Sequence, residues 1–286
     1  MTEETLALYV VPTPLGNLAD LTRRAAEVLC AVPWVAAEDT RHSAPLLKSL
    51  GSRARLIAAH EHNEQAAAEQ VIARLAAGES VALVSDAGTP GISDPGARLV
   101  ARVRAAGYRV VPLPGPCAAV TALSAAGLAE PHFLFYGFLP AKAGQRDEAV
   151  RGLADLPHAL VFYEAPHRIL ETVAALARGL GGERTLVIAR ELTKLFESIH
   201  SGPLGDAEAW LAADANRQRG EFVLLVSGAP PRQEEGLGGE VERVLRVLLA
   251  EGLPVKQVAR LAQAITGAGK NALYTRALEL RADATE

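Results

Sequence analysis

Residues 81–96 combine an apolar segment, a glycine-rich polar loop and a helix start, and this combination constrains the fold most. Residues 81–84 are all apolar and predict a short buried strand. The loop after it carries Asp86 and Ser93, and Asp94-Pro95 is typical of an N-cap followed by proline. In parallel α/β sheets, ligands bind where strands deliver such loops to helices. We therefore expect a ligand site here, although a capped turn that only starts a helix is the competing interpretation.

The same arrangement recurs through the first half of the chain. Apolar, β-prone segments lie at 6–11, 34–37, 56–59 and 109–113, and helical patterns separate them. Alternating strands and helices predict a mostly parallel, doubly wound sheet. Three of the loops that follow these strands are rich in Gly, Pro, Asp, Ser and Thr, which favours the ligand interpretation.

The second half predicts another α/β domain and a helical tail. Strands are expected at 133–136, 159–163, 185–189, 197–201 and 222–226, and antiparallel indications among them predict a mixed sheet. A segment rich in Pro, Gly and Glu precedes three short helical patterns. We therefore divide the chain into an N-terminal α/β domain (1–116), a second α/β domain (117–228), a linker (229–239) and a C-terminal helical domain (240–286).

The charge balance limits what the chain can bind. A net charge of −4 over 286 residues gives no global basic field, so a polyanion needs a local patch. Between residues 255 and 281 five cationic residues face one anionic residue, Glu279. Such a patch suits a phosphate backbone, and a solvated helix face explains the same charges.

Cysteine usage and hydropathy point to a cytoplasmic protein without metal or membrane contact. Cys30 and Cys117 lack CxxC or histidine pairing, so a disulfide framework or zinc site is not expected. We find no signal-peptide pattern and no apolar run of membrane length. The sequence also lacks G-x-G-x-x-G, the P-loop pattern and G-x-S-x-G. What remains is an enzyme that binds a polar small molecule between two α/β domains.

Six segments carry a resemblance to a known family. They are YVVPTPLGNLAD (9–20), AEDTRH (37–42), ALVSDAGTP (82–90), VPLPGPC (111–117), ARELTK (189–194) and KNALY (270–274). In this order, over about residues 7–280, they resemble the tetrapyrrole-methylase superfamily of S-adenosylmethionine (AdoMet) enzymes, and within it the ribosomal RNA 2′-O-methyltransferases. The resemblance implies AdoMet in a cleft between two α/β domains and a homodimer. It also implies methylation of a cytidine ribose in small-subunit ribosomal RNA. We expect the assembled subunit to be the substrate, and free ribosomal RNA is the alternative.

The resemblance further implies which residues meet AdoMet. One wall would be Pro14, Leu15 and Gly16, and the central loop would contribute Asp86, Gly88, Thr89, Ile92 and Ser93. A small-residue turn would add Cys117, Ala118 and Ala119, and the adenosine side would be lined by Phe162, Tyr163, Ala189, Phe222 and Val223. Apolar residues at strand ends are also ordinary core residues, which is the competing explanation for the last group.

Methyl transfer to a ribose hydroxyl is an in-line displacement that needs alignment and a proton acceptor. Glu38, Asp39, Glu164 and Glu191 fall at predicted strand ends. We select Glu191 as the proton acceptor, with Arg190 and Lys194 beside it to hold a phosphate or stabilise a developing alkoxide. The expected RNA contacts are Arg41, Lys256, Arg260, Lys270 and Arg276. Structural salt bridges explain the same charges.

Two other functions stay open at this point. A tetrapyrrole C-methyltransferase would share the cofactor site but would need no nucleic-acid surface. A non-catalytic module that binds AdoMet or RNA would need no proton acceptor.

Overall fold

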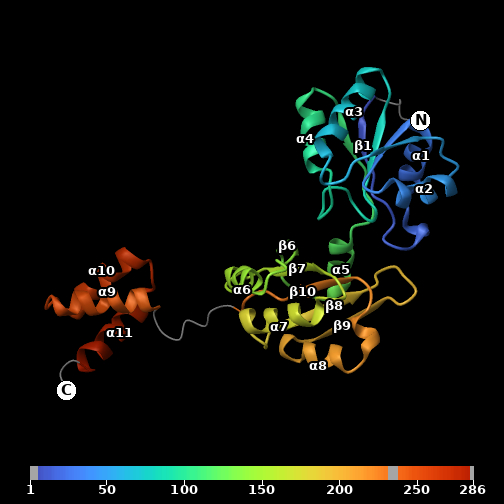
Figure 1. Cartoon of the computed structure of the whole chain (residues 1–286). Helices are drawn as coiled ribbons and strands as arrows, with labels where there is room; N and C mark the ends of the chain where they lie inside the picture. Colours follow the sequence, from blue (N-terminus) through green and yellow to red (C-terminus); the bar gives the residue numbers. More distant parts are fainter. Residues whose placement is uncertain (1–5, 231–237, 284–286) are drawn as a thin grey trace. The chain divides into compact units, whose positions relative to one another are not determined.

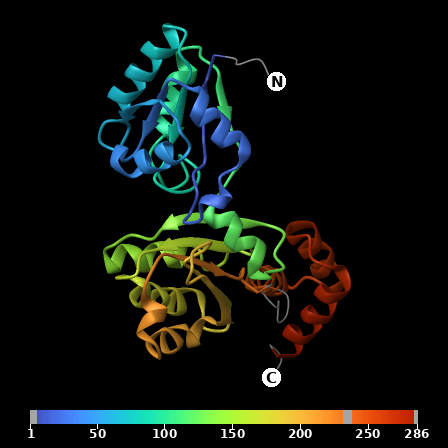
Figure 2. The ribbon, with the colours of Figure 1, turned by 90° about the vertical axis from the view of Figure 1, so that its right-hand side faces the viewer.

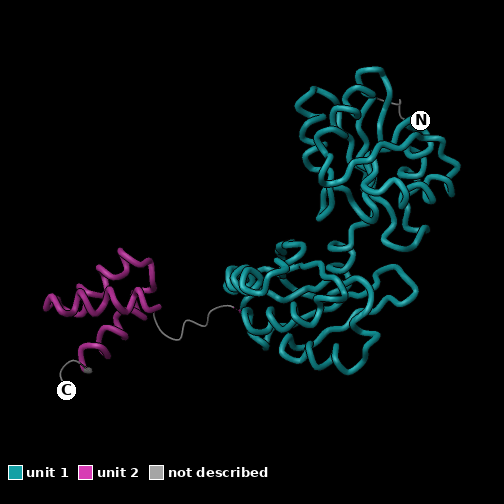
Figure 3. Tube along the Cα trace, in the orientation of Figure 1, with its two compact units in different colours: residues 1–229 teal, residues 230–286 magenta. Residues whose placement is uncertain are grey.

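The computed structural model describes residues 6–230 and 238–283. The chain divides into two compact units, residues 1–229 and residues 230–286 (Figure 3). The first unit contains two five-stranded sheets. The boundary that we expect between residues 116 and 117 stays a prediction, and most of the predicted linker (229–239) lies outside the described residues.

The first sheet is parallel throughout, as the alternating pattern predicted. It contains β1 (Leu8–Val10), β2 (Trp34–Ala37), β3 (Arg55–Ala58), β4 (Val81–Val84) and β5 (Val110–Pro112) in the order β3-β2-β4-β1-β5. Helices α1 (Arg23–Ala31) and α2 (Thr40–Ser49) pack on one face, while α3 (Glu64–Ala76) and α4 (Ala97–Ala105) pack on the other (Figures 1 and 2). Because both faces are covered, the central strands are apolar along their whole length.

The second sheet is mixed, as expected. It contains β6 (Phe133–Phe138), β7 (Ala159–Glu164), β8 (Thr185–Arg190), β9 (Ser198–Pro203) and β10 (Phe222–Val226) in the order β6-β7-β10-β8-β9. Only β6 and β7 pair in parallel among these strands. Helices α6 (Ala143–Gly152), α7 (Ile169–Leu180) and α8 (Ala207–Ala212) cover one face. Helix α5 (Ala118–Ala126) covers the other face, and it lies on the side of the first sheet (Figures 1 and 2).

The C-terminal unit is a three-helix cluster of α9 (Gly239–Ala250), α10 (Val255–Thr266) and α11 (Lys270–Asp283). Its core includes Leu245, Val258 and Leu273, all fully buried. The turn between α10 and α11 starts at Gly267, whose φ of +73° favours glycine. A short glycine turn between two helices is typical of a helix-turn-helix unit.

The predicted N-cap at Asp94 is wrong. Helix α4 starts at Ala97, and Gly96 is its N-cap with a φ of +131°. The buried carboxylate of Glu64, at the start of α3, accepts the Gly96 N–H at 2.5 Å. A residue distant in sequence therefore binds the N-cap N–H of this helix, and Asp94 does not cap it.

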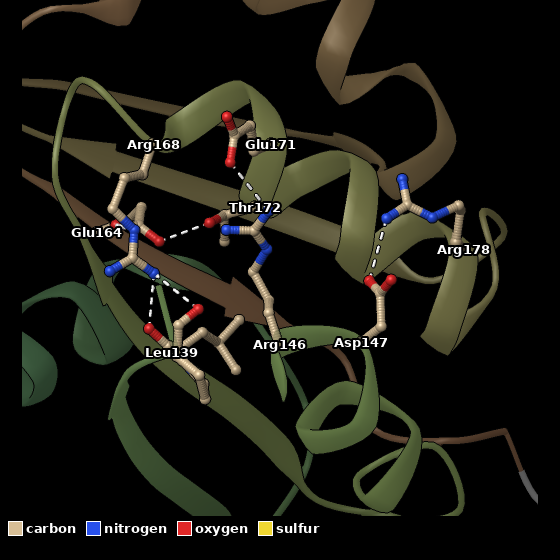
Figure 4. Close-up of polar contacts among 9 residues, drawn as sticks. Leu139, Arg146, Asp147, Glu164, Arg168, Glu171, Thr172 and Arg178 are labelled. Atoms are coloured by element: carbon tan, nitrogen blue, oxygen red, sulfur yellow. Dashed lines mark hydrogen bonds and ion pairs between the residues drawn. The ribbon is translucent and has the colours of Figure 1, made fainter. Parts of the chain in front are cut away.

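A buried ionic cluster fixes the carboxyl end of β7 (Figure 4). The Glu164 side chain is fully buried; its Oε2 accepts the Thr172 hydroxyl at 2.6 Å, and its Oε1 lies 3.2 Å from Arg168 Nε. Arg168 also donates to the Leu139 carbonyl at 2.6 Å. Because buried charges need partners, this cluster holds β7, α7 and the segment after β6 together.

Removing the Thr172 hydroxyl should destabilise the second sheet. Thr172→Val leaves Glu164 Oε2 without its donor, and an unsatisfied buried acceptor costs about 1–3 kcal/mol. Thr172→Ser keeps the donor and is the matched control. We expect a lower urea midpoint for the valine variant than for the serine variant, measured by the fluorescence of Trp210 in α8. Equal midpoints would contradict this account of the cluster.

Candidate functional site

The loops at the carboxyl end of the first sheet are bonded to one another. Thr13 and Gly88 exchange two backbone hydrogen bonds of 2.8 and 3.0 Å, and the Thr13 hydroxyl donates to the Ser85 carbonyl at 3.1 Å. Thr89 Oγ1 donates to the Pro116 carbonyl at 2.8 Å. The loops after β1, β4 and β5 therefore form one connected rim.

The loop after β4 needs backbone conformations that favour glycine. Gly88 and Gly91 have φ values of +79° and +82°, and Ser93 adopts +63°. A side chain on Gly88 would also come within 3.2 Å of Leu15. The glycines therefore allow the tight path of this loop past the β1 loop.

Two close approaches join this rim to the second sheet. A Cβ atom on Gly137 in β6 would lie 2.8 Å from Ser93 Oγ, and one on Gly16 would lie 2.4 Å from Lys194 Cγ. The absence of side chains at both glycines lets the two halves of the first unit meet.

A cavity of about 350 Å³ lies where the two halves meet. Small ligands occupy cavities from about this size upwards. Its walls come from the loops of the first sheet, the start of α5 and the strand ends of the second sheet. The lining residues are Leu15, Ala87, Gly88, Thr89, Ile92, Ser93, Asp94, Cys117, Ala118, Phe138, Tyr163, Glu164, Ala165, Pro166, Ala189, Leu192, Glu221, Phe222 and Val223.

Most of the predicted cofactor residues line this cavity. They are Leu15, Gly88, Thr89, Ile92, Ser93, Cys117, Ala118, Tyr163, Ala189, Phe222 and Val223. The structure brings these residues together from six separate segments of the chain. Their role in cofactor binding stays a prediction.

The other five predicted cofactor residues lie outside the lining. Gly16 packs on Lys194, and half-buried Pro14 precedes the lining residue Leu15. Asp86 Oδ1 accepts the Asp39 N–H at 3.1 Å and so ties the β4 loop to the β2 loop. Ala119, in the first turn of α5, is buried in the core between this helix and the second sheet. Phe162 is fully buried in the core on the opposite face of the second sheet, because neighbours along a strand point to opposite faces.

Several lining residues were not predicted as cofactor contacts, although Glu164 was considered as a proton acceptor. They are Ala87, Asp94, Phe138, Glu164, Ala165, Pro166, Leu192 and Glu221. Glu164 and Glu221 sit directly beside predicted strand ends, so strand-end position was a usable signal for them. Asp94 was missed because its sequence resembles a helix cap.

Asp94 in the cavity wall lies close to two further carboxyl groups, those of Glu38 and Asp86. Burial, together with the charges of Glu38 and Asp86, raises the pKa of Asp94 to about 6, although a hydrogen bond with Ser85 opposes the shift. Burial and the Asp86 charge likewise raise the pKa of Glu38. This end of the sheet therefore favours a cation, because a positive charge would relieve the repulsion among the carboxylates.

Tyr163 closes the cavity beside α5. Its hydroxyl accepts the Ala119 N–H at 3.0 Å, so it binds the first turn of the helix. Burial and the neighbouring Cys117 raise the pKa of Tyr163, which keeps the hydroxyl neutral. The ring packs edge-on against Phe135 and Phe138, and these aromatic contacts fix its orientation.

Two of the predicted catalytic residues share one ionic cluster near the cavity. Lys194 Nζ contacts Glu191 Oε1 at 3.0 Å and Glu221 Oε2 at 2.6 Å, and Glu191 Oε1 also accepts the Glu221 N–H at 3.0 Å. Burial alone would raise the pKa of Glu191, but these hydrogen bonds outweigh it and lower the pKa. Glu191 is therefore ionised at neutral pH. Of the three, only Glu221 lines the cavity.

Arg190 is engaged with its own loop. Its guanidinium donates to Ser198 Oγ at 3.2 Å, to the Arg219 carbonyl at 3.2 Å and to the Phe196 carbonyl at 3.0 Å. These bonds give Arg190 the role of fixing the segment between β8 and β9. A phosphate or alkoxide contact for Arg190 stays a prediction.

The predicted RNA contacts fall into two groups. Lys256 and Arg260 lie one turn apart on the exposed face of α10, and Lys270 is exposed at the start of α11. Arg276 instead pairs with Glu242 and Glu279, both at 2.8 Å, and so ties α11 to α9. Arg41 is exposed and pairs with Asp39 at 2.7 Å. Their contacts with RNA stay predictions.

Comparison with known proteins decides the family. The family described as Tetrapyrrole (Corrin/Porphyrin) Methylases matches residues 7–208, and the RsmI C-terminal HTH domain matches residues 235–281. Ribosomal RNA small subunit methyltransferase I from Escherichia coli O157:H7 is 54% identical over 95% of this chain and 94% of its own length. The same enzyme from Pseudomonas aeruginosa is 54% identical over 95% of this chain and 96% of its own length.

The chain belongs to the ribosomal RNA small subunit methyltransferase I family. A solved uroporphyrin-III C-methyltransferase from Thermus thermophilus, in complex with S-adenosylhomocysteine, resembles the fold with a TM-score of 0.52. It is 18% identical and covers 77% of this chain and 97% of its own, so the likeness shows the fold alone. The fold class expected from the sequence is thereby confirmed.

The described residues also show two absences. Within 6–230 and 238–283, no three His, Cys, Asp or Glu side chains form a group that could hold a metal ion. In the same ranges no helix has the length and apolar character that a membrane span requires.

The pKa of Asp94 predicts a pH-dependent affinity for AdoMet, which carries a cationic sulfonium and ammonium group. A raised folded-state pKa means that Asp94 binds a proton below about pH 6 and is a carboxylate above it. We expect AdoMet affinity, measured by calorimetry, to rise about tenfold from pH 5 to pH 7.5 by linkage.

Asp94→Asn should abolish that dependence and bind weakly throughout. Asp39→Asn is the matched control, because the Arg41 hydrogen bonds hold the pKa of Asp39 at about 2, outside the tested range. A pH profile for Asp94→Asn that matches the wild type would exclude Asp94 from the binding site.

Proposed function

We propose that this chain transfers a methyl group from AdoMet to the 2′-hydroxyl of a cytidine ribose in small-subunit ribosomal RNA. The observation that carries the proposal is the cavity between the two sheets, whose lining includes residues from four of the six segments that carry the family resemblance. The tetrapyrrole C-methyltransferase alternative is weaker, because the relatives that match nearly the whole chain are named for ribosomal RNA. The match of residues 235–281 to an HTH domain supports RNA as the substrate, because helix-turn-helix units commonly bind nucleic acids.

The cavity residues fit AdoMet in size and chemistry. The apolar walls formed by Ala118, Ala189 and Val223 suit the adenosine, and their small side chains leave backbone groups within reach. The backbone of the β4 loop at Gly88 and Thr89 would face the methionine part. Asp94, together with the nearby charge of Glu38, would bind the cationic groups of AdoMet. Bound AdoMet supplies an electrophilic methyl group on a good leaving group.

The remaining work is to orient the ribose and to accept its proton. Glu191 is ionised and anchored through Oε1, so we assign the acceptor role to its Oε2, directly or through a water molecule. Lys194 holds Glu191 and Glu221 in place and would stabilise negative charge that develops on the ribose oxygen. Alignment of hydroxyl and methyl is the larger contribution expected from the protein.

The C-terminal unit would supply RNA affinity. Lys256, Arg260 and Lys270 place exposed cations on α10 and at the start of α11, where phosphates could bind. The homodimer, the cytoplasmic location and the assembled subunit as substrate are part of this proposal. Sedimentation velocity of the full chain tests the dimer.

A transfer assay tests the function. Tritiated AdoMet should label small ribosomal subunits taken from a strain that lacks this methylation, and the label should resist alkaline cleavage at the modified ribose. A porphyrin precursor should stay unlabelled. The reverse result would favour the C-methyltransferase, and binding of AdoMet without any transfer would favour a non-catalytic module.

Filling the cavity should abolish transfer. Ala118→Leu adds three carbons at the cavity wall, so AdoMet affinity should fall at least tenfold and transfer should follow it. Ala125→Leu is the matched control, because Ala125 is exposed on the same helix. Unchanged affinity in the Ala118 variant would place AdoMet elsewhere.

Glu191→Gln should separate binding from chemistry. The glutamine carbonyl can still accept the Glu221 N–H, whereas basicity is lost. We expect kcat to fall about 100-fold or more, in line with general-base contributions, with AdoMet affinity unchanged. Glu208→Gln, on the exposed face of α8, is the control. Full turnover of the Glu191 variant would reject it as the proton acceptor.

A further inference from the structure

We propose that Phe196 is a stacking platform for a nucleobase of the ribosomal RNA at the mouth of the cavity. This inference rests on the proposed function and names a residue that positions its substrate. Of the six phenylalanines, all within the described residues, Phe196 is the most exposed at 67%. Its neighbour Leu195 is 89% exposed, and Ile199 on the edge strand β9 is 43% exposed. Adjacent large apolar side chains in solvent need an explanation.

The loop that carries Phe196 is held in a fixed shape. Arg190 donates to the Phe196 carbonyl at 3.0 Å, and Glu197 Oε2 accepts the Thr193 N–H at 2.5 Å. Further backbone bonds run from Lys194 N–H to the Glu191 carbonyl at 3.0 Å and from Glu197 N–H to the Lys194 carbonyl at 3.1 Å. These bonds fix the loop in a shape that keeps the side chains of Leu195 and Phe196 in solvent.

The same loop adopts backbone conformations that are unfavourable for its residues. Glu191 and Thr193 have φ values of +52° and +68°, although neither is glycine. Such residues persist only where the surroundings impose them, and they gather at functional sites. Here the imposed shape places Leu192 in the cavity wall and leaves Leu195 and Phe196 exposed beyond it.

The position of the loop relates Phe196 to the methyl acceptor. Lys194 contacts Gly16 in the loop after β1, and it pairs with Glu221, which lines the cavity. The segment between β8 and β9 projects from the second sheet on the same side as the β1 loop (Figure 1). The loop that carries Phe196 therefore borders the cavity through Leu192, and a base of RNA bound there would lie beside this loop.

An unstacked base needs a new partner when it leaves its RNA helix. Enzymes and binding proteins commonly supply an aromatic side chain, often with cations close by. Phe196 meets this requirement, with Lys194 and exposed Arg219 next to its loop. A second copy of this chain is the other occupant that could cover an apolar tip, and the experiment below distinguishes the two.

The test compares Phe196→Ala, Phe196→Trp and wild type on small ribosomal subunits that lack the methylation. Phe196→Ala should lower kcat/KM roughly 5- to 150-fold, the ratio that corresponds to base–aromatic stacking. Its AdoMet affinity should stay unchanged by calorimetry, and Phe196→Trp should retain activity. Phe133→Ala is the matched control, because Phe133 is 47% exposed at the opposite end of the second sheet.

Three outcomes would overturn the inference. If Phe196→Ala kept the wild-type kcat/KM, Phe196 would have no stacking role, and the proposed function would be unaffected. Loss of activity together with a shift from dimer to monomer in sedimentation velocity would assign the surface to a second copy of the chain. A wild-type enzyme that leaves small subunits unlabelled would contradict the proposed function itself, and this inference with it.

Discussion

The site depends on two close contacts in which a glycine on one side makes room for a side chain from the other. Ser93 in the β4 loop meets Gly137 in β6, and Lys194 meets Gly16 in the β1 loop. The paired backbone hydrogen bonds between Thr13 and Gly88 make the first-sheet rim continuous, so both contacts position the same cavity. A side chain at either glycine would overlap Ser93 Oγ or Lys194 Cγ, so these side chains or the cavity walls would have to move.

This geometry explains how two sheets of different topology can line one ligand cavity. The parallel first sheet directs its loops and acidic groups to one edge, as parallel sheets do. The mixed second sheet contributes small apolar strand ends and the ionic cluster of Glu191, Lys194 and Glu221. One side therefore attracts positive charge, and the other offers an apolar surface and the proposed proton acceptor. Neither half alone would combine binding with chemistry.

Much of this could be predicted from the sequence, and the failures share a physical cause. The strand positions and the cavity loops follow from local periodicity and turn residues, so their placement near 81–94 needed no tertiary information. Asp94 was misread because the helix begins after Gly96, whose N–H binds Glu64, 32 residues earlier in the chain. Phe162 points away from the cavity because strand parity, not residue type, decides the face. Arg190 and Arg276 pair with partners that only the folded chain brings close.

The most direct test of the central claim is a crystal structure of the full chain with S-adenosylhomocysteine. We predict density for the ligand between the loop at 87–94 and the strand ends at 163–166 and 222–223, with its amino group near Asp94. Density at any other position, or a cavity that stays empty at saturating ligand, would contradict the claim that the two sheets jointly hold the methyl donor.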